Sequence, residues 1–535
     1  MTATLLAATV AFAAFGDSLG NIGDVRLKGW LGERLDAMIE KHVAARDVDY
    51  ITAPFMEKTE TKGWWQTEFW GKWMHSAVPY AKLELESGVG ERLKSNVERS
   101  IERILASQEP GGYIGNYPNE LRCGEGWDVW GMKYTMMGLL HYYDFAQEQE
   151  IVVANSRSRR KDGEEVVVNS CSRRENGDNS TLQLQLPTTI QLLQAAVMTA
   201  EDIVKEEVNL AGGCASSEAW FHGAKKQHLP YVHLQETCVT TTWMRFCEKL
   251  LEVTDDPKWA DQIERTFYNA YLGALRSDGG EFAAYTPLTG NRWHGMNHCF
   301  MHTDCCTANG PRGFLCFLKE LFTTRGDAVT FNFYSSALVK GELSGGRKVA
   351  FDMYSLYPRT DFARIVSHTE GAVPVRLRIP AWSAKTEVKL NGETLEDVAA
   401  GSYFTIDRDW KLGDIVEVKF DMPVVAHTLD HHVAFTRGPV LLARDSRFAD
   451  GDLTEPLRHG IKDGQILPTF AAVRTPSDDI WMAFSATLPI GSHTENPEAS
   501  NPSTVFFCDY ASAGNTWTRA NFYRTWFPVE YGNNE

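Results

Sequence analysis

One carboxylate and three cysteine thiols stand in two short motifs and match the donor types of a zinc site. The first motif is Glu236-Thr237-Cys238, and the second is the adjacent pair Cys305-Cys306. Thiolate sulfur and carboxylate oxygen both bind Zn²⁺, and four such donors complete a tetrahedral site. The spacing is not that of two CxxC motifs, so the fold must bring the pairs together. From the residues alone, buried cysteines without a metal remain a second interpretation.

A glutamate beside two aromatic residues is the candidate proton donor. Glu218 shortly precedes Trp220 and Phe221, after a Gly-Gly pair. Aromatic neighbours that exclude water from a carboxyl group raise its pKa and keep it protonated near neutral pH. The alternative is a loop glutamate in solvent, and the sequence alone favours neither.

The ten cysteines are concentrated in the middle of the chain. A disulfide-stabilised secreted domain is short and rich in cysteine, and this chain is neither. The adjacent pair Cys305-Cys306 suits metal or thiolate chemistry better than two ordinary disulfides. His298, Cys299 and His302 lie just before this pair and form a competing ligand group, although residues in such a pattern are more often part of a loop or core.

Helices are expected to position these motifs. Between residues 26 and 325, apolar side chains recur at helical spacing, for example in 93–105, 243–251 and 259–275. Asp255-Asp256-Pro257 is a helix-start signal before the third of these stretches. A long series of amphipathic helices predicts a helical bundle, a solenoid or an α/α barrel.

Near residue 328 the hydrophobic period changes from helical to alternating. Residues 373–379 and 416–420 alternate apolar with polar or small side chains, and turn signals such as Asn391-Gly392 separate such runs. This pattern predicts an antiparallel β-sandwich over 326–535, with the domain boundary near Arg325-Gly326. Residues 155–182 are polar and without periodicity, which predicts a disordered or surface insertion in the helical domain.

Composition excludes several classes of function. The 535 residues carry a formal net charge of −17, without a large basic stripe, which argues against a nucleic-acid partner. No apolar run is long enough to span a membrane. Residues 1–25 form an N-terminal segment, apolar over Met1–Gly20, and no basic residue precedes Arg26, so export stays open alongside a cytoplasmic location. A homodimer is also left open.

These residues resemble glycoside hydrolase family 127, the β-L-arabinofuranosidase family. The resemblance covers nearly the whole chain except 150–185, and the combination of the Glu-Thr-Cys and Cys-Cys motifs is specific. The matching segments are Ser216–Glu218, Leu229-Pro230, Glu236–Cys238, Cys305-Cys306 with Asn309 and Arg312, the barrel helices 25–36, 67–73 and 127–140, and the sandwich segments 377–382, 391–392, 401–403, 410–414 and 437–445.

The resemblance implies an (α/α)6-type helical barrel that carries a zinc-dependent cysteine glycosidase, followed by the β-sandwich. It assigns the nucleophile to Cys305, the first cysteine of the pair, which would also bind the metal. It assigns the remaining zinc ligands to Glu236, Cys238 and Cys306. Zinc coordination would hold the Cys305 thiol as a thiolate at neutral pH.

The resemblance also assigns the general acid/base to Glu218 and an active-site tyrosine to Tyr285. Cys305 would attack the anomeric carbon while Glu218 protonates the departing oxygen. Glu218 would then deprotonate a water that displaces the sulfur, so the configuration at the anomeric carbon is retained.

Two features depart from the family pattern. Lys133-Tyr134 stands near the position of a Gly-His pair whose histidine faces the sugar, and a lysine there could meet the carboxylate of an acidic sugar. A lysine that extends from a helix toward solvent is an equally good interpretation. The middle of the barrel is also short, because 155–182 stands where histidine-bearing helices are expected, and an incomplete barrel would impair activity.

Four tryptophans could offer a stacking surface for sugar, namely Trp64, Trp65, Trp70 and Trp73. Core packing is the alternative for at least two of them, and Trp70 is the one selected here as a substrate contact. The function predicted from the sequence is a retaining exo-glycosidase that releases a terminal L-arabinofuranose-like sugar from plant-type glycans. The main alternative is a non-catalytic glycan-binding protein with a structural zinc ion.

Overall fold

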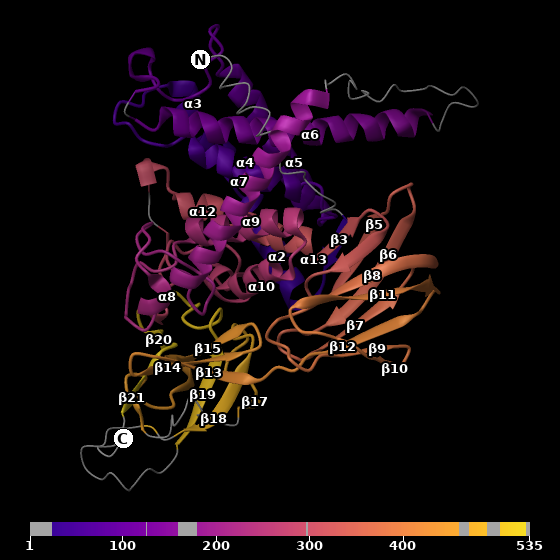
Figure 1. Ribbon diagram of the computed structural model, residues 1–535. Helices are drawn as coiled ribbons and strands as arrows, with labels where there is room; N and C mark the ends of the chain where they lie inside the picture. Colours follow the sequence, from indigo (N-terminus) through magenta and orange to yellow (C-terminus); the bar gives the residue numbers. More distant parts are fainter. Residues whose placement is uncertain are drawn as a thin grey trace.

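The computed structural model describes residues 24–124, 126–158, 179–295, 298–458, 470–488, 490 and 503–530. A helical part is followed by antiparallel β-sheets, as expected from the change of hydrophobic period (Figure 1). Residues 1–23, which include most of the apolar N-terminal segment, and residues 159–178 of the polar stretch lie outside the described residues. The two ends of that stretch are helical, because one helix runs to Ser158 and the next begins at Asn179.

The helical part contains a long series of helices, some of which pack against the next helix in the chain and others across an intervening helix. Helix α4 packs along α6, α9 along α10, and α3 along α5. The helices are α2 (Gly29–Met38), α3 (Val48–Glu57), α4 (Glu68–Tyr80), α5 (Ser87–Ala106), α6 (Asp128–Ser158), α7 (Asn179–Glu206), α8 (Gly223–Lys226), α9 (Thr237–Thr254), α10 (Pro257–Thr266), α11 (Leu272–Ala274), α12 (Cys305–Asn309) and α13 (Arg312–Leu321).

Two glycines allow α4 and α6 to approach closely. A Cβ atom added to Gly71 of α4 would lie 2.3 Å from the backbone oxygen of Tyr134, and one added to Gly131 of α6 would lie 2.0 Å from Thr67 Oγ1. Real Cβ atoms do not tolerate such distances, so larger residues would push the two helices apart. The side chains that these helices carry toward the site therefore have a fixed relative position.

Two sheets form the first β-region. The seven-stranded sheet has the order β1-β5-β6-β7-β12-β9-β10, and the four-stranded sheet has the order β11-β8-β4-β3, in which only β4 and β8 pair in parallel. The strands are β1 (Val25–Leu27), β3 (Phe322–Arg325), β4 (Ala328–Phe331), β5 (Ala337–Glu342), β6 (Lys348–Ser355), β7 (Phe362–Ser367), β8 (Gly371–Ile379), β9 (Glu387–Leu390), β10 (Glu393–Leu395), β11 (Ser402–Trp410) and β12 (Ile415–Lys419).

The expected boundary at Arg325-Gly326 falls in the turn between β3 and β4. Strand β1, which precedes α2, pairs with β5, so the segment that leads into the helices belongs to the seven-stranded sheet.

A third, ten-stranded sheet completes the chain and lies apart from the first two (Figure 1). Its main path is β16-β21-β14-β15-β19-β18-β17, and β13, β20 and β2 join it at the sides. The strands are β2 (Thr289–Gly290), β13 (Val424–Leu429), β14 (His432–Arg437), β15 (Val440–Asp445), β16 (Leu457–Arg458), β17 (Ala471–Val473), β18 (Ala483–Leu488), β19 (Ser503–Asp509), β20 (Tyr523–Arg524) and β21 (Phe527–Glu530).

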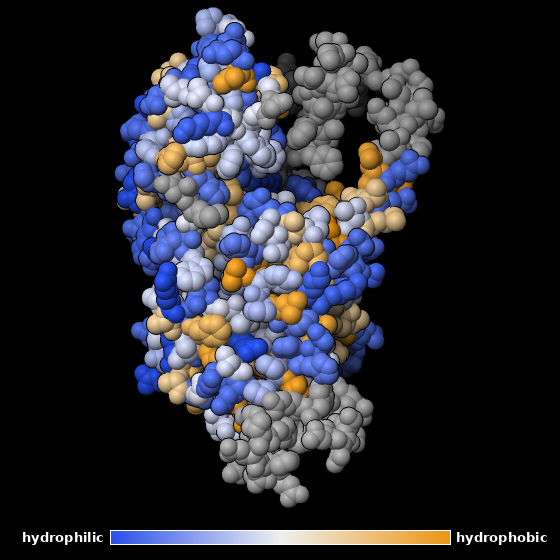
Figure 2. All heavy atoms as spheres, turned by 90° about the vertical axis from the view of Figure 1, so that its left-hand side faces the viewer, coloured by the Kyte–Doolittle hydropathy of each residue, from blue (hydrophilic) through white to orange (hydrophobic). Residues whose placement is uncertain are grey.

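The surface carries no single apolar face in the view of Figure 2, where hydrophobic residues are scattered among hydrophilic ones. Within the described residues, no helix is both long and apolar enough to cross a membrane.

A buried ion pair joins the helical part to the β-sandwich. Arg378 of β8 is fully buried and donates to Asp261 and, at 2.6 Å, to Glu264 Oε1 of α10. Glu264 also accepts hydrogen bonds from the Tyr357 hydroxyl at 2.7 Å and from Trp382 Nε1 at 3.3 Å. Arg378 thus neutralises carboxylates that the interface removes from water.

Replacing Arg378 by methionine is expected to destabilise this interface by about 3–5 kcal/mol, because a buried carboxylate loses its partner. Differential scanning calorimetry measures the effect as a lower temperature of the first unfolding transition. The control is Arg364→Met, which removes an exposed pair with Glu417 and should cost roughly 0–1 kcal/mol. Equal transition temperatures for the two variants would contradict the role given to Arg378.

Candidate active site

The start of α9 positions two of the four predicted donors. Glu236 is the N-cap residue of this helix, and its Oε2 accepts a hydrogen bond from the backbone N–H of Val239 at 3.2 Å. Cys238 follows in the first turn. The backbone N–H of Thr237 donates to the carbonyl oxygen of Ala284 at 2.9 Å, which fixes the helix start against the neighbouring segment. One glutamate oxygen therefore serves the helix, and the other is available to the cysteines.

The short helix α12 positions the other two donors. Asp304 caps this helix by accepting a hydrogen bond from the backbone N–H of Thr307 at 2.6 Å. Cys305 and Cys306 are the first two residues of the helix and are buried, with exposed fractions of 9% and 2%. Because both cysteines follow the cap directly, their side chains leave the same end of the helix.

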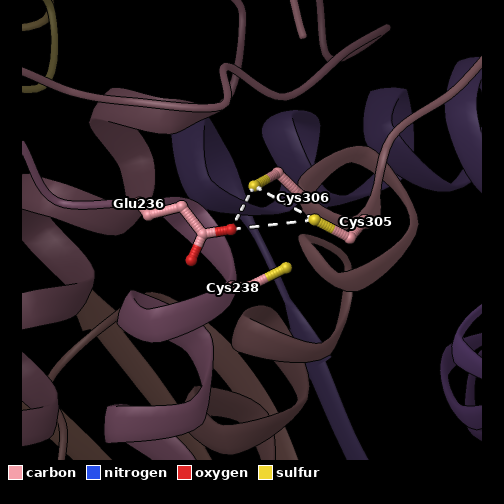
Figure 3. A group of neighbouring side chains, drawn as sticks. All are labelled: Glu236, Cys238, Cys305 and Cys306. Atoms are coloured by element: carbon pink, nitrogen blue, oxygen red, sulfur yellow. Dashed lines mark hydrogen bonds between the residues drawn. The ribbon is translucent and has the colours of Figure 1, made fainter. Parts of the chain in front are cut away.

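The four side chains converge on one point (Figure 3). Cys306 Sγ lies 2.8 Å from Glu236 Oε1, Cys305 Sγ lies 3.8 Å from the same oxygen, and the two sulfurs are 4.0 Å apart. One donor atom from each of the four residues lies within 4.8 Å of all the others. Donors in a tetrahedral zinc site are roughly 3.5 Å apart at bond lengths of about 2.0–2.3 Å. The donor set thus fits a tetrahedral metal ion.

The competing ligand group is not assembled. Within the part of the chain that the structure describes, no other set of three or more His, Cys, Asp or Glu residues meets the same geometric test. His298 lines the same cavity as Cys305, whereas His302 lines a different cavity.

The surroundings of the cysteines shift their thiol pKa values in different directions. Hydrogen bonds from Cys238 and Cys306 lower the pKa of Cys305 to about 6, and the positive charge of Lys72 acts in the same direction. The hydrogen bond to Cys305 raises the pKa of Cys238 to about 12. Burial, with the neighbouring charge of Cys238, raises the pKa of Glu236 to about 8. Cys305 is thus the sulfur of this group that most readily becomes a thiolate.

A cavity of 780 Å³ opens in front of this group. Helices α4, α6 and α9 contribute much of its wall, and the loops before α9 and α12 contribute most of the rest. The lining residues used below are Trp65, Glu68, Lys72, Trp127, Trp130, Tyr134, Glu218, Trp220, Glu236, Cys238, Tyr285, Cys305 and Cys306. Most sites for small ligands have volumes of about 300–1,000 Å³, so this cavity has room for a sugar and part of its leaving group.

Glu218 lies in the wall of this cavity and is exposed to solvent. Trp220 is also exposed, by 57%, so of the two interpretations that the sequence left open the structure agrees with a loop glutamate in solvent. The loop bends back on itself, and Ala215, Ser217 and Glu218 have positive φ angles of 67°, 48° and 65°. Non-glycine residues in this region cost free energy and are concentrated at functional sites.

A backbone hydrogen bond holds this strained loop. The Ser217 N–H donates to the carbonyl oxygen of His233 at 2.9 Å. The charge of Glu218 contributes to raising the pKa of both Glu236 and Tyr285, which agrees with its place in the same cavity wall. The loop therefore presents the carboxylate to the cavity while leaving it in contact with solvent.

Two of the four predicted substrate contacts line the cavity. Tyr285 forms a bridge with Glu236 through the backbone, and its ring centroid lies 4.8 Å from that of His233. Burial, followed by the charge of Glu236, raises the pKa of the Tyr285 hydroxyl to about 12. Tyr134 of α6 also belongs to the wall.

The other two predicted contacts do not line it. Trp70 is fully buried with its ring edge-on to Phe55, so its selection as a sugar contact is wrong. It sits at a helix position that faces the core, where a large apolar side chain is stabilising. Lys133 is absent from the wall, and its Nζ lies 3.5 Å from the Trp130 ring centroid and 4.2 Å from that of Tyr134.

The structure adds residues that the sequence reasoning missed. Trp127 and Trp130 line the cavity, as do Glu68 and Lys72 of α4, beside Trp65, which the sequence had already indicated as a possible stacking surface. The spacing of Glu68 and Lys72 is that of an ion pair on one helix face, and this signal was available in the sequence. Nothing in the spacing alone indicates that this face is buried.

Comparisons with known proteins agree with this site. Residues 185–318 match the family model described as "Beta-L-arabinofuranosidase, GH127 catalytic domain", and residues 328–422 match "Beta-L-arabinofuranosidase, GH127 middle domain". A non-reducing end β-L-arabinofuranosidase of Bifidobacterium longum subsp. longum is 22% identical over 323 residues. That alignment covers 52% of this chain and 47% of the relative, so it spans about half the relative's length.

Solved structures share the fold. A GH127 β-arabinofuranosidase superposes with a TM-score of 0.71 at 17% identity, covering 95% of this chain and 97% of the other. A GH127 β-L-arabinofuranosidase from Geobacillus stearothermophilus T6 gives a TM-score of 0.67 at 17% identity, covering 95% of this chain and all of the other. The matched catalytic and middle domains confirm the resemblance to glycoside hydrolase family 127 that was seen in the sequence, and the solved structures show that the chain shares the fold.

Proposed function

We propose that this chain is a retaining exo-glycosidase that removes a terminal L-arabinofuranose-like sugar from plant-type glycans. One observation carries the proposal. An acidic thiol, Cys305, and a carboxylate, Glu218, line the same cavity of 780 Å³. A nucleophile and a proton donor around one cavity are what a double-displacement glycosidase requires. The matched family models and the relative from Bifidobacterium support the choice of sugar.

We further propose that the metal is Zn²⁺, held by Glu236, Cys238, Cys305 and Cys306. Three thiols and one carboxylate favour zinc over the oxygen-preferring Mg²⁺ and Ca²⁺. When bound, zinc would supply the positive charge that keeps the cysteines deprotonated at neutral pH. The fit of the four donors to a tetrahedron supports this choice.

The reaction then follows from the residues of the cavity. Cys305 Sγ attacks the anomeric carbon and forms a sulfur–carbon bond as the glycosidic carbon–oxygen bond breaks. Glu218 gives its proton to the departing oxygen. In the second half, the Glu218 carboxylate takes a proton from water, the water oxygen bonds to the anomeric carbon, and the sulfur leaves as a thiolate. Two inversions give net retention of configuration.

The test joins metal content with turnover. Purified protein is analysed for zinc and assayed with p-nitrophenyl β-L-arabinofuranoside. One zinc per chain with release of nitrophenolate is the expected result. Protein without zinc that nevertheless turns over would contradict the metal assignment. Zinc without turnover on this substrate or on other pentofuranosides would contradict the glycosidase.

Replacing Glu218 by glutamine is expected to lower kcat/KM by about 10²–10⁴-fold on a sugar leaving group, because the departing oxygen is then not protonated. On the nitrophenyl substrate, whose leaving group needs little protonation, the loss in glycosylation should be much smaller. Glu252→Gln is the control, since Glu252 is exposed on α9 and outside the cavity. Equal losses on both leaving groups would contradict the acid/base role of Glu218.

A non-catalytic glycan-binding protein with a structural metal is the second candidate. The exposure of Glu218 favours it, because active sites usually exclude water from the groups that carry out the chemistry. A shortened middle of the barrel would also favour a protein that binds glycan without hydrolysing it. Zinc and glycan binding without turnover would establish this second function.

A further inference from the structure

A buried lysine touches the cysteine group from α4. Lys72 is 4% exposed, and its Nζ lies 3.9 Å from Cys238 Sγ and 3.2 Å from Glu68 Oε1. An ammonium group inside a protein is costly unless it is paired and hydrogen-bonded. Glu68 supplies that pairing, so the contact with Cys238 is an additional use of the same charge.

The position of Lys72 is fixed from several sides. The second oxygen of Glu68 accepts a hydrogen bond from Trp130 Nε1 of α6, and the Lys72 ammonium lies 5.1 Å from the Tyr134 ring centroid. The close approach of α4 and α6 at Gly71 keeps both helices in this register. The ammonium group therefore has little freedom to turn away from Cys238.

The charge balance explains why a cation is useful there. Three thiolates and one carboxylate around a divalent metal ion leave a net negative charge in a buried place. Among the described residues that line the cavity, Lys72 is the only lysine or arginine. Its contact is with Cys238, on the α9 side of the group, whereas Cys305 and Cys306 contact Glu236 and each other.

We propose that Lys72 is a positioning residue of the metal site, an inference that rests on the proposed function. Its ammonium donates an N–H to Cys238 Sγ and offsets part of the negative charge of the group. Cys238 is thereby held as a permanent ligand, and Cys305, which lacks this hydrogen bond, is left as the sulfur free to react. Groups that contact metal ligands typically change metal affinity by about 10–100-fold when removed.

The test uses metal binding alone, without a sugar. Lys72→Met is compared with Lys133→Met, a lysine on α6 that stacks on Trp130 and does not touch the cysteines. Zinc affinity is measured by competition with a chromophoric chelator. Lys72→Met is expected to bind zinc about 10–100-fold more weakly than wild type, while Lys133→Met stays within about twofold. Equal affinities for both variants would overturn the inference.

The absorption spectrum of the Co²⁺-loaded protein is a second measurement, and a simple loss of packing at Lys72 would not shift its charge-transfer band. The sulfur-to-cobalt charge-transfer band of Co²⁺-loaded Lys72→Met is expected at lower energy than in wild type, because the thiolate has lost an N–H donor. An unchanged band overturns the inference even if affinity falls. If the methionine variant does not fold, Lys72→Gln serves instead: weaker zinc binding with a shifted band supports the inference, and wild-type values overturn it.

The outcomes separate this inference from the proposed function. Wild-type protein that binds zinc without hydrolysing any furanoside contradicts the glycosidase, while the comparison of Lys72→Met with Lys133→Met still decides the role of Lys72. If the wild-type protein binds zinc and hydrolyses a furanoside, and Lys72→Met has wild-type zinc affinity and an unchanged cobalt band, the inference about Lys72 is wrong and the proposed function stands. Wild-type protein that binds neither zinc nor cobalt overturns both.

Discussion

Replacing Cys305 by serine is expected to abolish turnover, with a fall in kcat of about 10⁴–10⁶-fold, as when other covalent nucleophiles are removed. A serine hydroxyl remains protonated where the Cys305 thiol, with its pKa of about 6, is largely a thiolate. Glu236, Cys238 and Cys306 remain as three ligands, so the variant should still bind zinc, although more weakly. Initial rates on the nitrophenyl substrate at saturating zinc measure the loss.

Two controls separate the nucleophile from the other thiols. Cys299→Ser makes the same change in a buried cysteine of the same apolar cluster, outside the metal group, and should keep activity within about tenfold. Cys306→Ser removes a ligand but keeps the nucleophile, and should recover part of its turnover at high zinc. Mass spectrometry of a quenched wild-type reaction should find the pentosyl group on the peptide with Cys305. A zinc-loaded Cys305→Ser variant with wild-type rates would exclude the mechanism.

Removing the metal is expected to abolish activity reversibly and to lower the melting temperature. The four donors are buried or nearly so, and without a cation their thiolates would repel one another in a place with little water. A ligand present at about 1,000 times its Kd stabilises the folded state by about 4 kcal/mol. Chelation by dipicolinate, followed by gel filtration and calorimetry, measures the loss, and added zinc should restore both activity and melting temperature.

Cys238→Ala gives the same result without a chelator. This variant should lose zinc and activity together, because the proposed site would keep only three of its four donors, one of which is the proposed nucleophile. Magnesium added to the chelated protein is the matched control and should restore nothing, since it prefers oxygen donors. Full activity in protein with less than about one tenth of a zinc ion per chain would contradict the metal-dependent mechanism at its centre.

The metal group could be predicted because its residue types are rare in combination. Glu236, Cys238, Cys305 and Cys306 are few among hundreds of residues, and thiolate chemistry limits what such a set can do. The change of hydrophobic period near residue 328 indicated the passage from helices to strands for an equally local reason, because backbone geometry dictates that period. The change of period needed no knowledge of distant contacts, whereas the two metal motifs lie far apart in the chain and were joined into one site only by the family resemblance.

The features that the sequence did not predict depend on contacts between segments that lie far apart in the chain. Trp65 and Trp70 are both tryptophans of one short stretch, yet one faces the cavity and the other the core, and only the packing of α4 separates them. The exposure of Glu218 is a similar case. It depends on the conformation of a loop with positive φ angles, and the composition of that loop does not reveal this conformation. Strand β1 pairs with β5 across the whole helical part, a contact between residues far apart in the chain.

The buried pair of Arg378 with Asp261 and Glu264 has a consequence for how far this protein can be divided or recombined. Each side of the junction carries charges that only the other side can balance. A chimera that joins this helical part to the sandwich of a distant relative would need to inherit all three residues as one set. The helical and β parts therefore form one electrostatically coupled structural unit, even though separate family models describe segments of each.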